Sequence, residues 1–177
     1  MSIRELINDH TREDQKRLFW HKPAIQDQVK RHMLISVDLR NTLEGPWKTA
    51  AEERRCGQLR GDLDAFVEGR RISVANHPYE KDRTAYIARV DPVAAEIWDI
   101  RSIDPSPSIR VLGCFAERDL FVALVWSHRY HLDGPGGPLW EAFIKRAQLE
   151  WRRLFLTYIP CSGSEISDYI SENFFAV

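Results

Sequence analysis

The sequence predicts an α+β fold: a mostly antiparallel sheet, built as a meander, flanked by N-terminal helices and a long C-terminal helix. Three short apolar runs in mid-chain, separated by turn segments, predict the meander. An apolar stripe at helical spacing, which follows a glycine- and proline-rich segment, predicts the last helix. A chain of 177 residues suits one domain with a substantial core. We expect a helical N-terminal extension (1–45), a helix plus antiparallel sheet (46–132) and C-terminal helices (138–177).

The N-terminal region has helical spacing that a proline interrupts. Thr11, followed three residues later by Asp14, resembles a capping box and predicts a helix that continues through residues 18–20. Pro23 ends this helix or begins the next one. Residues 34–39 allow a short strand.

A stronger helix is predicted over residues 49–68. Its apolar residues recur at steps of three to five, and Gly69 is placed to adopt the left-handed conformation past its end. The charged residues between the apolar ones are typical of a solvated face.

Five runs rich in β-branched and aromatic residues predict the strands of the sheet. A turn at Pro78 separates the first two, and the prolines of residues 104–108 break the chain between the third and fourth. The last run is apolar at every position, so we place it in the interior of the sheet. The five runs are 71–75, 84–90, 97–101, 109–115 and 120–126.

The last third of the chain begins with a break at residues 133–138. Three glycines and two prolines exclude a helix or strand there, and the absence of a GK[ST] ending favours a plain connector over a phosphate-binding loop. Pro138 can begin the long helix, whose apolar stripe runs to Phe155. A short helix from Ser164 to about residue 173 and a buried apolar end at 174–177 complete the prediction.

Composition limits the function. With 25 basic and 26 acidic residues the formal charge is −1, which excludes a chain-wide electrostatic surface for nucleic acid. Three distant cysteines favour reduced thiols, and the chain lacks GxSxG, HExxH, CxxC and GxGxxG motifs. Pro23 also argues against one metal site made by His10, His21 and His32. We therefore expect no metal, no cofactor and no membrane span, and a cytoplasmic protein without a signal peptide.

A group of basic, imidazole and phenol side chains lies in and after the meander. Arginines stabilise the charge of a phosphoryl transition state, while His or Tyr exchanges protons near neutral pH. Such a set can cleave RNA without a metal, by attack of the ribose 2′-hydroxyl on the phosphate. The alternative is that the arginines pair with Asp99, Asp104 or Glu117 and that the chain after the last strand is an exposed end. The candidate catalytic residues are Arg101, Arg110, His128, Arg129 and Tyr130, with His131 beside them.

Four cations lie on the last long helix between its apolar residues. They can contact RNA phosphates, although a solvated basic face has the same pattern. These candidate RNA-binding residues are Lys145, Arg146, Arg152 and Arg153.

Part of the meander resembles the RelE/HigB/ParE superfamily of toxin-like proteins over about 40 of the 177 residues. The shared order is W-x-I-R, a turn, I-R-V-L-G-x-F, a hairpin, an apolar strand and a polar basic end. Trp98, Arg101, Arg110, Phe115 and the His128–His131 cluster carry it. In that family a helical segment precedes an antiparallel meander, and basic, His and Tyr residues on the sheet cleave mRNA on the ribosome. Members are usually smaller and strongly basic, and the lysine pair after their last strand is here replaced by Ser-His-Arg.

The resemblance implies a toxin-type protein that binds or cleaves RNA, with RNA or the ribosome as target and an antitoxin-like polypeptide as partner. A non-enzymatic assembly protein, including a homo-oligomer, is the alternative. A third candidate is a small-molecule enzyme whose pocket lies where the sheet meets the long helix.

Overall fold

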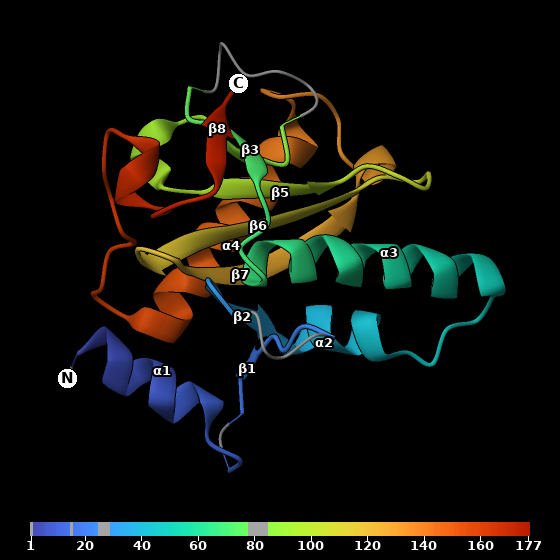
Figure 1. Cartoon of the computed structure of the whole chain (residues 1–177), viewed down its shortest axis with the longest axis horizontal. Helices are drawn as coiled ribbons and strands as arrows, with labels where there is room; N and C mark the ends of the chain where they lie inside the picture. The colour runs from blue at the N-terminus through green and yellow to red at the C-terminus, as the bar shows by residue number, and fades with distance from the viewer. Residues whose placement is uncertain (1, 15, 25–28, 78–84) are drawn as a thin grey trace.

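The computed structural model describes residues 2–14, 16–24, 29–77 and 85–177. One eight-stranded mixed sheet, in the order β1-β2-β7-β6-β5-β4-β3-β8, carries helices on both faces (Figure 1). The helices are α1 (Ile3–Thr11), α2 (Val37–Glu44), α3 (Ala50–Val67) and α4 (Pro138–Phe155). The strands are β1 (Leu18–Trp20), β2 (His32–Ser36), β3 (Ile72–Ala75), β4 (Ile87–Arg89), β5 (Trp98–Ser102), β6 (Ile109–Glu117), β7 (Leu120–His128) and β8 (Phe174–Ala176).

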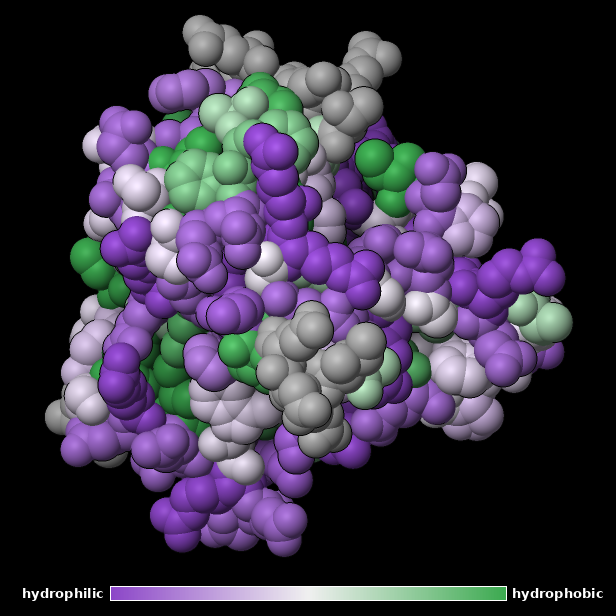
Figure 2. Space-filling view, in the orientation of Figure 1, coloured by the Kyte–Doolittle hydropathy of each residue, from purple (hydrophilic) through white to green (hydrophobic). Residues whose placement is uncertain are grey.

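Two hydrophobic cores lie on opposite faces of the sheet. The α1 and α4 side chains pack with Leu112, Cys114 and Val122 on one face. The α2 and α3 side chains pack with Trp98 and Phe121 on the other. Successive strand residues point to opposite faces, so the wholly apolar β7 serves both cores. Hydrophilic residues cover most of the outer face seen in Figure 2, especially over α1.

The predicted meander is present as β5, β6 and β7, each antiparallel to the next. The hairpin turns between Glu117 and Leu120, where Asp119 adopts a positive φ of 61°. Gly113 lies in a bulge of this pair, and a Cβ there would come 2.1 Å from the backbone oxygen of Val122. Only glycine allows the two strands to approach so closely at this point.

The rest of the sheet departs from the mostly antiparallel prediction. β2 pairs in parallel with β7, and β3 pairs in parallel with both β4 and β8. Parallel neighbours need long connections, and α2, α3, β3 to β6 and their loops lie between β2 and β7 in the sequence. The α+β class is confirmed, but the sheet is mixed and larger than the five strands predicted.

At the N-terminus the helix lies earlier than predicted. Ser2 and Glu5 form the capping box that begins α1, and the helix ends at Thr11. Residues 18–20 are β1, an edge strand paired with β2, and not a helix. The predicted strand at 34–39 is only partly right, since β2 ends at Ser36 and α2 follows at once.

The two long helices agree with the sequence pattern. α3 is capped by the Thr49 side chain, and Gly69 follows it with a φ of 71°. α4 begins at Pro138, and its first amides are bound by Asp133, whose carboxylate accepts from the backbone N–H of Leu139 (3.0 Å) and Trp140 (2.8 Å). The glycine-rich connector thus carries a remote cap for α4.

Two predicted segments near the ends of the sheet differ or cannot be placed. In place of a helix over 164–173 there is a single 3-10 turn, Ile166–Asp168, followed by edge strand β8. The predicted burial of the apolar end is only partial, since Phe175 and Val177 are 40% and 37% exposed. The turn at Pro78 and the start of the strand at Thr84 lie outside the described residues.

Candidate functional site

The two strand arginines of the predicted site share one buried carboxylate. Asp99 Oδ2 accepts from Arg101 Nε and from Arg110 Nη1, each at 3.0 Å. Side-chain exposure is 3% for Asp99, 6% for Arg101 and 17% for Arg110. Burial lowers the pKa of Arg110, and the charge of Asp99 opposes that shift. The pairing with Asp99 that we kept as an alternative is therefore present.

The strand register separates these arginines from His128. Arg110 stands opposite Arg101 on one side and Ser127 on the other, on the α4 face. His128 stands opposite Ile109, one residue further along, on the α3 face. Because adjacent strand residues point to opposite faces, the predicted catalytic set does not converge on one surface.

Three rings gather where β7 ends. His128 stacks on Tyr130 with ring centroids 5.2 Å apart and planes 14° apart, and His131 meets Tyr130 edge-on at 4.2 Å. Tyr130 and His131 belong to the 3-10 turn Arg129–His131, and Tyr130 is 65% exposed. We call His128, Tyr130 and His131 the ring cluster. It presents aromatic faces to solvent at the end of the sheet.

The surroundings of His128 favour its neutral form. Burial lowers its pKa, and the positive charges of His131 and Arg55 lower it further. Its Nδ1 is buried and has no hydrogen-bond partner among the described residues. A neutral imidazole with one free nitrogen can accept a proton from a bound hydroxyl group.

Arg129 holds the loop that follows the ring cluster. Its Nη1 donates to the carbonyl oxygens of Leu132 (2.5 Å) and Asp133 (3.0 Å). Its positive charge also lowers the pKa of Arg110, after the larger effect of burial. The structure thus gives Arg129 a role in positioning the chain before α4.

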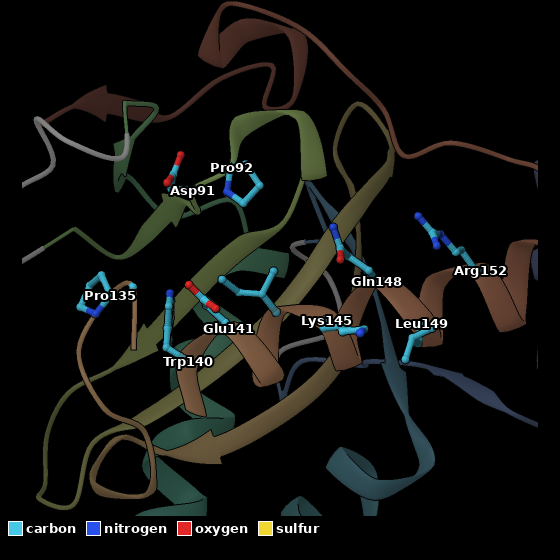
Figure 3. A pocket seen from close by; sticks show the side chains of 11 residues that line it. Asp91, Pro92, Pro135, Trp140, Glu141, Lys145, Gln148, Leu149 and Arg152 are labelled. Carbon is cyan, nitrogen blue, oxygen red and sulfur yellow. The ribbon is translucent and has the colours of Figure 1, made fainter. Parts of the chain in front are cut away.

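The four basic residues of α4 lie on two sides of the helix. Lys145 and Arg152 line a cavity of about 520 Å³ that also contains Trp140 and the Asp91–Pro92 segment (Figure 3). Arg146 and Arg153 line a different cavity of about 320 Å³, and Arg153 is paired with Glu150 at 2.8 Å. The predicted RNA-binding residues do not form one continuous basic surface.

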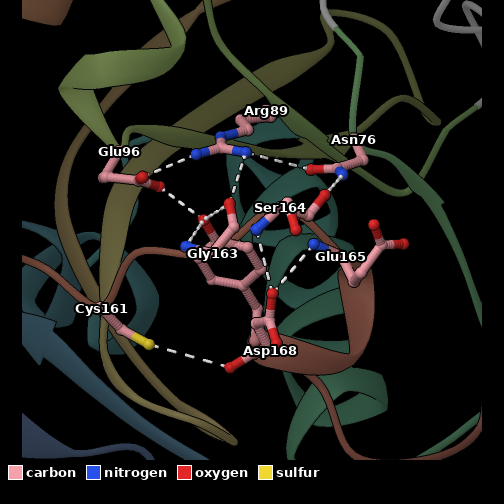
Figure 4. A network of polar contacts seen from close by, with 9 residues as sticks. Asn76, Arg89, Glu96, Cys161, Gly163, Ser164, Glu165 and Asp168 are labelled. Carbon is pink, nitrogen blue, oxygen red and sulfur yellow. Dashed lines mark hydrogen bonds and ion pairs between the residues drawn. The ribbon is translucent and has the colours of Figure 1, made fainter.

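A buried polar network that the sequence analysis missed lies near the β8 edge (Figure 4). Arg89 binds Glu96 at 2.6 Å, and the Tyr169 hydroxyl donates to the other oxygen of Glu96 at 2.8 Å. The same hydroxyl accepts from the Gly163 N–H, and Arg89 donates to the Gly163 carbonyl. The sequence signal that could have revealed this network is Arg89, which follows apolar residues in β4. A guanidinium buried in this way requires a buried hydrogen-bond acceptor. These contacts attach the C-terminal segment to the sheet.

No protein-family model, curated protein or solved structure matches this chain. Among the described residues, no group of three or more His, Cys, Asp or Glu side chains is placed to hold a metal ion. None of the described helices is both long and apolar enough to span a bilayer.

Proposed function

We propose that the protein is a RelE-like RNA-binding protein that holds single-stranded RNA on the ring cluster and cleaves it without a metal. The exposed stack of His128 on Tyr130 is the observation that carries the proposal. Unpaired bases stack on aromatic faces, which contributes about 1 to 3 kcal/mol per base. Stacking also suits a chain with a formal charge of −1, because it needs no large basic surface.

The two imidazoles of the ring cluster supply acid–base chemistry. Neutral His128 takes the proton of the ribose 2′-hydroxyl, and that oxygen forms a bond to phosphorus. The bond from phosphorus to the 5′-oxygen breaks, and His131 acts as the general acid that gives a proton to the leaving oxygen. The ring centroids of the two histidines are 5.8 Å apart, close enough for both imidazoles to reach one phosphodiester group. The products are a 2′,3′-cyclic phosphate and a 5′-hydroxyl.

Arg101 and Arg110 have no direct part in this proposal. Both are bound to Asp99 on the opposite face of the sheet, so they stabilise the meander that presents the ring cluster. The order of elements also supports the proposal. Helix α3 comes before the antiparallel strands β5 to β7 in the sequence, and the RelE-like resemblance implies a helical segment before an antiparallel meander.

A labelled single-stranded RNA and its all-2′-deoxy analogue test both parts. We expect both to bind, but only the RNA to be cut. Tyr130→Ala should weaken binding about tenfold through the loss of a stacking face, while Tyr130→Phe should retain it. His128→Gln should abolish cleavage with binding retained. Absence of binding by the unaltered protein, or equal binding by Tyr130→Ala, would refute the proposal.

A toxin of this kind acts on messenger RNA, with the ribosome as its site of action and an antitoxin-like polypeptide that masks it. Expression in a bacterial host should then stop growth, and the His128→Gln variant should restore it. Unimpaired growth with intact message levels would exclude the toxin role.

Apolar side chains around α4 favour a second candidate function, assembly with another subunit or a second copy. Leu149, Leu156 and Ile159 are 54%, 67% and 77% exposed. Leu156→Glu tests this by light scattering, and an unchanged mass at concentrations where the unaltered chain associates would refute it. Trp151, an aromatic residue of the same helix, cannot mediate such assembly because it is 3% exposed and belongs to the core.

A further inference from the structure

A cavity of about 400 Å³ lies beside edge strand β1 and is lined by residues of the chain around β1, of α2 and of α3. Four cations line it: Lys16, Lys22, Arg40 and Arg60. We call this the basic cavity. Its elements differ from those that carry the ring cluster, which lies at the end of β7.

The basic cavity concentrates positive charge on a chain that is nearly neutral. Its lining residues include four cations and one carboxylate, Glu44, a formal charge of 4 − 1 = +3, against −1 for the whole chain. Glu44 is bound to Arg40 at 2.8 Å. In the part of the chain that the structure describes, Lys22 and Arg60 have no ion-pair partner within 4 Å. Lys16 also contacts Glu13 at 3.9 Å, so Lys22 and Arg60 are the cations that remain to attract an anion.

Aromatic residues give the basic cavity a second type of contact. Phe19 makes cation–π contacts with two of the cations, Arg40 at 4.1 Å and Lys16 at 5.4 Å from its ring centroid. Trp20 lines the cavity and remains 43% exposed, with His32 edge-on at 6.0 Å. Trp20 is the strand residue after Phe19, so its indole leaves the sheet on the opposite face, and Phe19 is the ring that contacts the cations.

His21 provides a fixed polar group in the lining. Its Nε2 contacts Asp64 Oδ1 at 2.7 Å, and Asp64 Oδ2 accepts the backbone N–H of Ala24 at 3.2 Å. Because Asp64 accepts at Nε2, neutral His21 carries its proton there. The side chain of His21 is only 3% exposed, so the His21–Asp64 pair fixes the wall of the cavity.

We propose that the basic cavity binds a phosphorylated small molecule. Lys22 and Arg60, the two lining cations without a carboxylate partner among the described residues, bind the phosphate groups. A volume of about 400 Å³ falls in the range of small-ligand sites, roughly 300 to 1,000 Å³. The ring cluster takes no part in this binding.

Isothermal titration of the full chain with ADP, inorganic phosphate and adenosine tests the proposal. We expect ADP to bind most tightly, since its two phosphates offer the cations more negative charge than inorganic phosphate does, and adenosine offers none. Arg60→Gln should weaken ADP binding about tenfold. Arg54→Gln, which removes an exposed cation of the same helix outside the cavity, should leave it unchanged. Trp20→Ala, which changes a side chain on the other face of the sheet, should leave the binding of both ADP and phosphate unchanged.

Two outcomes would overturn the site. One is the absence of ADP binding by the folded chain at about 5 mM, a concentration at which even millimolar affinity is detected. The other is an equal effect of Arg60→Gln and Arg54→Gln. Tyr130→Ala should leave ADP affinity unchanged, so this proposal and RNA binding at the ring cluster fail or succeed independently.

Discussion

Buried guanidinium groups hold this molecule together in two ways. Arg101 and Arg89 are bound to carboxylates, whereas Arg31 and Arg55 are bound by backbone carbonyl oxygens. Arg31, 1% exposed, donates to the carbonyls of Phe66, Arg70, Glu172 and Asn173 and so ties the end of α3 to the C-terminal segment. Each of these side chains fixes a contact between segments far apart in sequence.

Asp99→Asn should be among the most damaging single substitutions. It removes the charge that Arg101 and Arg110 share on a buried face, which costs about 3 to 5 kcal/mol of unfolding free energy. Urea unfolding measures the loss. Glu117→Gln, which breaks the surface pair with Arg4, is the control and should leave the midpoint unchanged. Equal effects of the two substitutions would contradict a buried role for Asp99.

Acid should destabilise the fold through His21. Burial lowers the pKa of His21 below its ordinary value near 6.5, although Asp64 opposes the shift. The unfolded chain therefore binds the proton more readily, and stability falls as the pH drops below about 6.5 towards the folded-state pKa. Unfolding midpoints at pH 7.5 and pH 5.5 should differ less in His21→Gln than in the unaltered chain. The pKa of His128 is also lowered, so the same pair of midpoints measured for His128→Gln distinguishes its contribution from that of His21.

The chemistry of single residues was predictable from sequence, but their partners were not. The pattern identified Arg101 and Arg110 as arginines that need an acceptor, and it named Asp99 among the candidates. It could not show that His128 faces the other way, because one residue of register decides the face. The basic cavity was missed because residues 18–20 were interpreted as helix, and because Arg60 reaches it only through the tertiary packing of α3.

At the scale of elements, local periodicity predicted what depends on local contacts. α3, α4 and the meander lie where the apolar spacing placed them, with ends shifted by a few residues. β1 and β8 were misassigned and β2 was only partly placed, since a strand of three to five residues carries a weak pattern. Their pairing partners lie far away in the sequence, so no local signal marks them.

The Tyr169 hydroxyl should control how firmly the C-terminal segment is held. Tyr169→Phe removes its bonds to Glu96 and Gly163 and leaves buried polar groups without a partner, which costs about 1 to 3 kcal/mol. Hydrogen exchange should accelerate at the amide of Val177, which donates to Val74. Tyr130→Phe, on an exposed ring, is the matched control. Unchanged exchange at Val177 in Tyr169→Phe would show that other contacts suffice.

At the scale of the whole molecule, the sheet interleaves the two ends of the chain. β2 from the N-terminal part lies against β7, and β8 from the C-terminus lies against β3. Neither end can detach without exposing a neighbouring strand of the core. We therefore expect urea unfolding followed by tryptophan fluorescence and by far-UV circular dichroism to give coincident curves. Separate transitions would mean that the N-terminal strands form an independent unit.

The parallel pairing of β2 with β7 also bears on how the chain is made in the cell. A ribosome releases Met33, Leu34 and Ile35 long before it adds Phe121, Val122 and Ala123, the residues that stand beside them in the finished sheet. During that interval β2 lacks its partner β7, and its unpaired apolar edge can associate with other proteins. Synthesis speed and chaperone supply should therefore govern the yield of active protein more strongly than small changes in the stability of the mature fold.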